Sequence, residues 1–242
     1  EVTGELPAGV YAKDIILQII RTLGVDGGVG HVYEYGGPAI EALDMEGRLA
    51  VCNMSIEGGA RAGYINPDAT TYEYLAGRPY VPDGEEFEAL VDDWESLRSD
   101  TDAVYDDTVT VDADGLAPQV TWGINPGQVV AIDEPVPAPA DITDPTARTA
   151  AEKAIEHMAI TPGEPMAGYP VDVAFLGTCT NGRLSDFREA AAILEGTSVD
   201  PDVWAVAVPG SEQVRVRRRA SMRCSSMRGS SGARRGVRCA SR

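Results

Sequence analysis

The stretch Val-Asp-Val-Ala-Phe-Leu-Gly-Thr-Cys-Thr-Asn-Gly-Arg, residues 171–183, places a thiol between a predicted strand and a predicted helix. Residues 171–176 form an apolar run typical of a buried strand, and helical spacing of apolar residues follows through 184–194. Cys179 lies in the turn between them, where α/β proteins place ligand-binding groups. The alternative is a buried structural cysteine, because a free cysteine usually behaves as a small hydrophobic residue.

The alternation of strands and helices extends toward the N-terminus. Apolar periodicity, capping residues and turn residues predict helices at 12–23, 38–43, 44–61, 70–76, 85–97 and 147–158, and strands at 31–35, 109–111, 120–122, 129–132 and 203–208. Such alternation indicates an α/β fold with a parallel or mixed sheet. Because residues 135–147 are rich in Pro and Ala, we expect a domain of residues 1–134, a linker, and an α/β segment of residues 148–214.

A second stretch is more specific than the thiol turn. Residues 45–63 read Met-Glu-Gly-Arg-Leu-Ala-Val-Cys-Asn-Met-Ser-Ile-Glu-Gly-Gly-Ala-Arg-Ala-Gly. Residues 66–79 read Asn-Pro-Asp-Ala-Thr-Thr-Tyr-Glu-Tyr-Leu-Ala-Gly-Arg-Pro, and residues 118–127 read Pro-Gln-Val-Thr-Trp-Gly-Ile-Asn-Pro-Gly. In this order and spacing they resemble the aconitase family, and within it the large subunits of dehydratases acting on isopropylmalate. The resemblance covers residues 2–214.

The resemblance implies a fold, a cofactor and a partner. The fold is aconitase-like α/β, with parallel or mixed sheets and flanking helices, and is incomplete here. The cofactor is a [4Fe-4S] cluster held by three cysteine thiolates, of which Cys179 is one. The implied activity is a hydro-lyase that isomerises 2-isopropylmalate and 3-isopropylmalate by dehydration and rehydration in leucine biosynthesis. The catalytic base is expected on a separate small subunit.

Asn53 and Glu57 match the Asn-Met-x-x-Glu pattern of the wider family. We predict them on one face of a helix, because they are four residues apart. The carboxylate would handle the proton of the departing water, giving it to the leaving hydroxyl and taking it back when water returns, and the amide would orient that water. An ordinary solvated glutamate beside a surface asparagine is the alternative. Sister activities also remain open: an aconitase, a homoaconitase, a methylmalate-type dehydratase, or a non-catalytic remnant with a basic tail.

Residues 215–242 differ in composition from the rest of the chain, with ten arginines and no acidic residue. A nucleic-acid-binding tail and a disordered tail are two interpretations. A third is a shifted reading frame. When codons are written for residues 228–242 and the same letters are read one nucleotide earlier, they give a Cys-x-x-Cys peptide. This peptide resembles the family's other cluster-ligand segment. Cys224 and Cys239 then have no inherited role. We expect the printed chain to lack its start and two cluster cysteines, and to be inactive.

The charge of the chain argues against nucleic acid as a partner. Residues 1–214 carry 10 basic and 38 acidic side chains, a net charge of −28, and Lys13 and Lys153 are the only lysines. Binding by counterion release requires basic surface. An acidic shell with few lysines suits a cytoplasm of high ionic strength, as in a halophile, where salt screens repulsion. A merely acidic mesophilic surface is the alternative.

The chain shows no sign of membrane insertion or secretion. No run approaches the roughly 18 consecutive apolar residues that a membrane span needs. The first residues lack the order of charged, apolar and small residues typical of a signal peptide. Its four cysteines stand in unrelated contexts and indicate no disulfide framework. We therefore expect a soluble cytoplasmic protein.

We predict that the chain needs salt to stay folded, since its carboxylates repel one another unless screened. The Debye length falls from about 10 Å at about 0.1 M salt to about 3 Å at about 1 M, which quenches most surface repulsion. The melting temperature should therefore rise between about 0.1 M and about 2 M KCl, and partial protonation near pH ~5 should recover stability at low salt. A melting temperature independent of KCl would contradict the halophile hypothesis.

Overall fold

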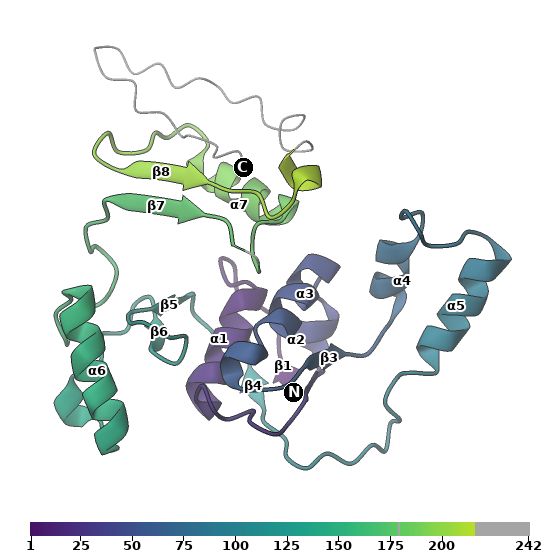
Figure 1. Cartoon of the computed structure of the whole chain (residues 1–242), viewed down its shortest axis with the longest axis horizontal. Coiled ribbons are helices and arrows are strands. Elements are labelled where there is room, and N and C mark those ends of the chain that lie inside the picture. Colours follow the sequence, from purple (N-terminus) through teal and green to yellow (C-terminus); the bar gives the residue numbers. More distant parts are fainter. Residues whose placement is uncertain (179, 216–242) are drawn as a thin grey trace. The chain divides into compact units, whose positions relative to one another are not determined.

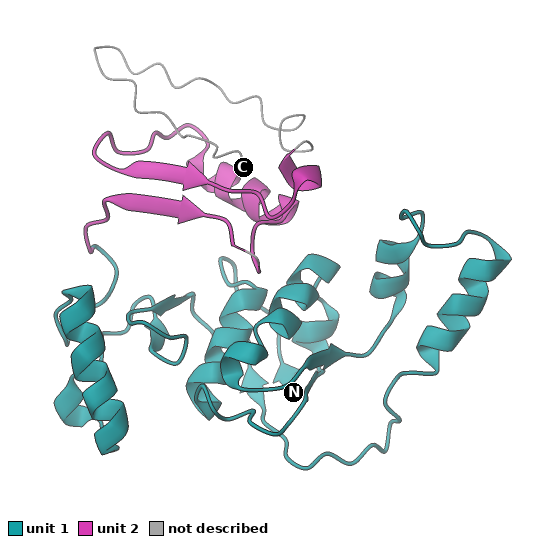
Figure 2. Ribbon diagram, viewed as in Figure 1, with its two compact units in different colours: residues 1–168 teal, residues 169–242 magenta. Residues whose placement is uncertain are grey.

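The computed structural model describes residues 1–178 and 180–215. They fall into two compact units, residues 1–168 and a unit that begins at Tyr169 (Figure 2). The helices are α1 (Ala12–Leu23), α2 (Pro38–Glu41), α3 (Met45–Asn53), α4 (Ala69–Leu75), α5 (Glu85–Glu95), α6 (Pro145–Met158) and α7 (Leu184–Leu194), with 3-10 turns η1 (Ile56–Gly58) and η2 (Pro139–Asp141). The strands are β1 (Val2–Thr3), β2 (Tyr33–Tyr35), β3 (Gly63–Ile65), β4 (Val111–Asp112), β5 (Gln119–Thr121), β6 (Val129–Ala131), β7 (Val173–Leu176) and β8 (Trp204–Ala207) (Figure 1).

Helix α1 has the predicted range, residues 12–23. Interactions of nearby residues fix both its start and its end. The Asp14 carboxylate accepts a hydrogen bond from the Tyr11 backbone N–H at 2.8 Å and so caps the first turn. Gly24 has φ +83°, a conformation that glycine adopts without strain, and the helix ends there. Asp14 also accepts from the Gln119 N–H at 2.7 Å, which ties α1 to β5.

The core of the first unit forms around the apolar face of α1. Three isoleucines of this face have no solvent exposure and pack with residues of β1, β2, α2 and α3. Burying a side chain of this size stabilises the fold by about 1.5–3 kcal/mol. The fully buried core residues with the largest side chains in this cluster are Ile15, Ile16, Ile20, Ile40, Val2 and Val51.

The described strands pair two by two, and both kinds of pairing occur. Strand β1 pairs with β4, β2 with β3, and β7 with β8, all in parallel, whereas β5 and β6 are antiparallel. Helices separate the parallel partners along the chain, which confirms the predicted α/β class with parallel or mixed sheets. Within the described residues, no helix is both long and apolar enough to cross a membrane.

Helix α3 is shorter than predicted. The expectation of a helix through residue 61 is wrong, because α3 ends at Asn53 and η1 follows. The Ser55 N–H bonds to the Cys52 carbonyl at 3.2 Å, in a tighter turn than an α-helix makes. Gly59 then adopts φ +85°, which reverses the chain toward β3.

The first unit also extends further than predicted. Residues 135–147 were expected to link two domains, but the compact unit continues to residue 168. The Val136 N–H donates to the Glu164 carbonyl at 2.9 Å, and the Gly163 N–H donates to the Val136 carbonyl at 2.8 Å. These backbone hydrogen bonds hold the segment after α6 against the proline-rich segment before it.

The second unit contains the strand–turn–helix pattern of residues 171–194. Strands β7 and β8 pair in parallel from Val173↔Trp204 to Leu176↔Ala207, and α7 lies between them in the chain. Phe187 of α7 is 2% exposed and forms the centre of this unit. The predicted strands and helix are confirmed in position, but the expectation that the first strand is buried is wrong, because Val173 and Phe175 are 52% and 59% exposed. The proposed tail at 215–242 lies outside the described residues except for Arg215.

A buried ion pair joins three helical elements of the first unit. The Arg48 side chain is 4% exposed, and its guanidinium binds both carboxylate oxygens of Asp68 at 2.7 and 2.8 Å. Arg48 also donates to the carbonyls of Glu41 and Leu43, at 2.8 and 3.1 Å. Asp68 in turn caps α4 by accepting from the Thr71 N–H at 3.3 Å. The hydrogen bond from Arg48 lowers the pKa of Asp68 below its ordinary 3.8.

We predict that Asp68→Asn lowers the free energy of unfolding by about 2–3 kcal/mol near pH ~7, somewhat less than for a fully buried pair because Asp68 is partly exposed. A carboxyl with a lowered pKa stabilises the fold above its unfolded pKa, and this stabilisation is lost as the pH falls through the folded pKa. The difference from the parent chain should therefore shrink below pH 3.8. Denaturant unfolding at several pH values measures it, with exposed Asp93→Asn as the control. Equal effects of the two substitutions on the free energy of unfolding would contradict a stabilising role of the Arg48–Asp68 ion pair.

Candidate functional site

Glu57 lies at the middle of the turn η1, and its side chain is exposed. Two backbone hydrogen bonds of the turn share one acceptor. The Ser55 carbonyl accepts from both the Gly58 and the Ala60 N–H, each at 3.1 Å. Ser55 and Gly58 are buried on either side of Glu57. The backbone of the turn is therefore anchored in the protein while the carboxylate faces solvent.

A glycine-rich loop, residues 24–31, packs against this turn. The Gly28 N–H donates to the Gly58 carbonyl at 2.8 Å, and the Arg61 N–H donates to the His31 carbonyl at 2.9 Å. A Cβ on Gly28 would lie 2.6 Å from the Ala60 nitrogen, so the approach requires glycine. The sequence analysis missed this contact. The density of glycines at 24–30 was the available signal, since close backbone approach is one reason for glycine.

The predicted arrangement of Asn53 and Glu57 on one helical face is wrong. Asn53 is the last residue of α3, whereas Glu57 belongs to the separate turn η1. The physical cause is the early end of α3, which removes the regular rotation that brings residues i and i+4 together. Both side chains are exposed on the same short segment. Each remains a candidate on its own.

Cys179, the predicted cluster ligand, lies outside the described residues, but the turn around it is well defined. The Asn181 N–H donates to Thr178 Oγ1 at 2.9 Å, and the Thr178 N–H donates to the Asn181 carbonyl at 2.7 Å. The carboxylate of Asp186 accepts from Asn181 Nδ2 at 3.2 Å and from the Arg183 N–H at 2.8 Å. The turn thus joins the carboxyl end of β7 to a capped α7, as the sequence indicated.

Two polar atoms of this turn are buried without a hydrogen-bond partner among the groups described: Asn181 Oδ1 and Arg183 Nε. Asp186 accepts from the Asn181 amide nitrogen, so the amide oxygen is turned away from it. Leaving such atoms unpaired costs about 1–3 kcal/mol each. An acceptor and a donor without partners beside Cys179 fit a turn that is completed by a further group.

Cys52 is the cysteine that the structure describes, and it packs against the core of the first unit. Cys52 lies on α3 and is a free thiol, partly buried. Burial raises its pKa to about 11, which keeps the sulfur protonated near neutral pH. A cluster ligand must be a thiolate. In the described ranges, no group of three or more His, Cys, Asp or Glu side chains is placed to hold a metal ion, and Cys224 and Cys239 lie outside those ranges.

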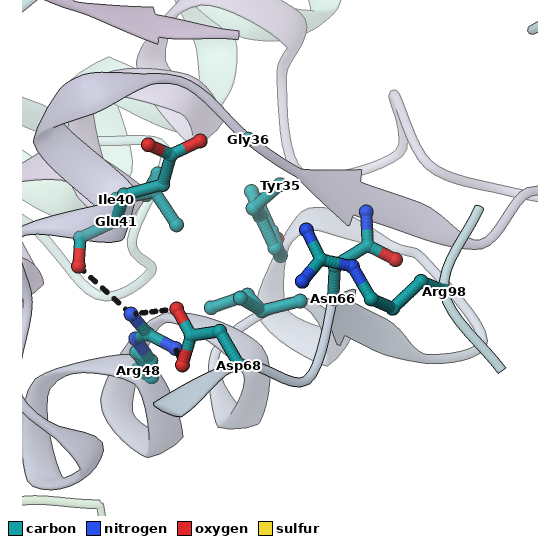
Figure 3. Close-up of a pocket in the computed structure, with 9 residues that line it drawn as sticks. Tyr35, Gly36, Ile40, Glu41, Arg48, Asn66, Asp68 and Arg98 are labelled. Atoms are coloured by element: carbon teal, nitrogen blue, oxygen red, sulfur yellow. Dashed lines mark hydrogen bonds and ion pairs between the residues drawn. The ribbon is translucent and has the colours of Figure 1, made fainter. Parts of the chain in front are cut away.

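A pocket of about 310 Å³ opens elsewhere in the first unit (Figure 3). Three of its polar side chains are already paired: Arg48 binds Asp68, and Asn66 donates at 3.3 Å to Glu34, which lies outside the lining. The Arg98 guanidinium also faces the opening in Figure 3. Glu57 does not line this pocket. The lining residues are Tyr35, Gly36, Ile40, Glu41, Arg48, Ile65, Asn66, Asp68 and Arg98.

Comparison with known proteins gives one family over nearly the whole chain. The sequence profile of the aconitase family (aconitate hydratase) matches residues 1–235. The match includes the turn that carries Glu57 and the turn around Cys179.

Individual relatives agree with the profile. The chain is 59% identical over 217 residues to the 3-isopropylmalate dehydratase large subunit of Salinibacter ruber, covering 89% of this chain and 46% of that protein. Over 216 residues it is 60% identical to the protein of the same name from Halorubrum lacusprofundi and 59% identical to that from Haloferax volcanii, with the same two coverages. The chain therefore spans about half the length of these relatives.

Proposed function

The chain belongs to the aconitase family, and we propose that it forms part of the large subunit of a 3-isopropylmalate dehydratase. Such an enzyme interconverts 2-isopropylmalate and 3-isopropylmalate by removing water and adding it back, a step of leucine biosynthesis. The observation that carries the proposal is the high identity, along most of the chain, to relatives that bear this name. The shared segment contains both candidate turns, at Glu57 and at Cys179.

The proposed reaction requires help for its leaving group. Hydroxide leaves carbon poorly, and a [4Fe-4S] cluster, when bound, supplies a Lewis acid for it. Cys179 would hold this cluster through its thiolate, together with two cysteines that the printed frame lacks. The unpaired Asn181 Oδ1 and Arg183 Nε support this placement, because the turn has bonding capacity that its own residues leave unused.

Glu57 would handle the proton of the departing water. Its carboxylate is exposed on a turn anchored by buried Ser55 and Gly58, so it can meet a substrate while the backbone of the turn stays fixed. A carboxylate can accept a proton from a water that returns to the substrate and give it back in the reverse direction. Asn53, exposed four residues earlier, would orient that water through its amide.

A small subunit would complete the enzyme. The relatives are named as large subunits, which motivates a heteromer with a second chain that supplies the base for the substrate carbon. The assembly would work in the cytoplasm, where reducing conditions keep cluster thiols available.

We predict that residues 1–214 support turnover when grafted into a relative. In this hybrid large subunit they replace the matching segment of the Haloferax volcanii protein, and 3-isopropylmalate conversion is followed by the absorbance of the unsaturated intermediate. The hybrid should turn over only when the Haloferax small subunit is added, because we assign the base to that subunit. Turnover by the hybrid alone would contradict the heteromer, and an inactive hybrid with a normal cluster would contradict the assigned function.

Two substitutions in the hybrid should separate binding of the cluster from proton transfer. Cys179→Ser should abolish the cluster, measured by visible absorption and electron paramagnetic resonance after anaerobic reconstitution, because a thiolate ligand is lost. Glu57→Gln should keep the cluster but lower kcat by roughly 100-fold, the usual contribution of a placed acid or base. Glu86→Gln, an exposed carboxylate on α5, is the matched control. Near-normal turnover of Glu57→Gln would show that Glu57 is an ordinary solvated surface residue.

A further inference from the structure

Strand β2 lies beside the turn that carries Glu57 and contacts it through two tyrosines. Tyr33 and Tyr35 are two residues apart, and their rings meet edge to face with centroids 6.0 Å apart. The Tyr33 hydroxyl donates to the Gly58 carbonyl at 3.2 Å. The Tyr35 hydroxyl lies 2.7 Å from Ser55 Oγ. The two hydroxyls therefore contact the residues at the two ends of the turn.

The contact between Tyr35 and Ser55 is fully enclosed. Ser55 has no solvent exposure and Tyr35 is 5% exposed. Ser55 Oγ also lies 3.5 Å from the Val51 carbonyl oxygen, and either hydroxyl can donate in the bond between Tyr35 and Ser55. Burial raises the pKa of Tyr35 far above its ordinary value, which keeps this hydroxyl protonated. Breaking this hydrogen bond would leave a buried hydroxyl without a hydrogen-bond partner, which is unfavourable.

Ser55 is the residue on which the turn closes, since its carbonyl accepts from both Gly58 and Ala60. The surroundings leave it little freedom to shift. A Cβ on Gly63 would lie 2.2 Å from Ser55 Oγ, so the next strand is packed directly against this side chain. A serine fixed in this way sets the position of the two residues that follow it, and Glu57 is the second of them.

We propose that Tyr35 and Ser55 are positioning residues for Glu57, and that their buried hydrogen bond fixes the backbone from which the Glu57 carboxylate reaches the substrate. The inference rests on the proposed function, because it assigns Glu57 a role in the reaction. Neither residue touches the substrate. Their effect passes through the backbone of η1, where a displacement of about 1 Å can lower a rate by roughly 100-fold.

The test is a double-substitution cycle in the hybrid large subunit with its small subunit. Tyr35→Phe keeps the ring and removes only the hydroxyl, and it should lower kcat by roughly 10-fold with little change in KM. In the Glu57→Gln background the same substitution should cause no further loss, since residues that act through one another are not additive. Tyr64→Phe, which removes a hydroxyl that donates to the Leu97 carbonyl at 2.8 Å, is the control and should leave kcat unchanged in both backgrounds.

The outcomes distinguish the two proposals. An equal loss from Tyr35→Phe in both backgrounds, or no loss in either, would overturn the positioning role while leaving Glu57 in place. Normal kcat for Glu57→Gln alone would instead overturn the role of Glu57 itself. If circular dichroism shows that Tyr35→Phe does not fold, Ser55→Ala removes the same hydrogen bond from the other side and takes its place in the cycle.

Discussion

The burial of one face of α1 is the constraint on which the first unit depends. Three isoleucines of that helix are shielded from water, and α3, η1 and the short strands pack around them. None of the paired strands is longer than three residues in this unit, so the sheets contribute few ladder hydrogen bonds of their own. The helix supplies the apolar surface that such small sheets lack, and this places the turn of Glu57 at the edge of a rigid core.

Two turns carry the proposed chemistry, and they are built on different principles. The turn of Glu57 is held at both ends: Ser55 Oγ is bonded to β2 and the Gly58 carbonyl to β2 and the glycine-rich loop. Among the described groups, Asn181 Oδ1 and Arg183 Nε in the turn around Cys179 have no hydrogen-bond partner. Bonds at both ends of a turn fix the backbone that carries a side chain, whereas a buried polar atom without a partner favours the arrival of another group. This contrast agrees with an acid–base role for the first and a cofactor role for the second.

Local signals predicted much of the fold, and tertiary contacts account for what they missed. The ranges of α1 and α7 follow from apolar periodicity and from carboxylates that cap their first turns. The end of α3 depends instead on Ser55, whose partner Tyr35 lies 20 residues away in the chain. The extent of the first unit depends on backbone bonds between Val136 and Glu164, which composition does not reveal. Asn53 and Glu57 were found through a motif, but their arrangement was not.

The pairing of Arg48 with Asp68 gives this acidic chain a contact that dissolved ions reach mainly from the side of Asp68. Screening by salt acts on charges that mobile ions can surround, and the Arg48 side chain is 4% exposed. When the ionic strength of the medium changes, repulsion between surface carboxylates changes with it, but the attraction at this junction changes less, although Asp68 is 29% exposed. The junction of α2, α3 and α4 can therefore keep its geometry in a cell whose internal salt concentration fluctuates.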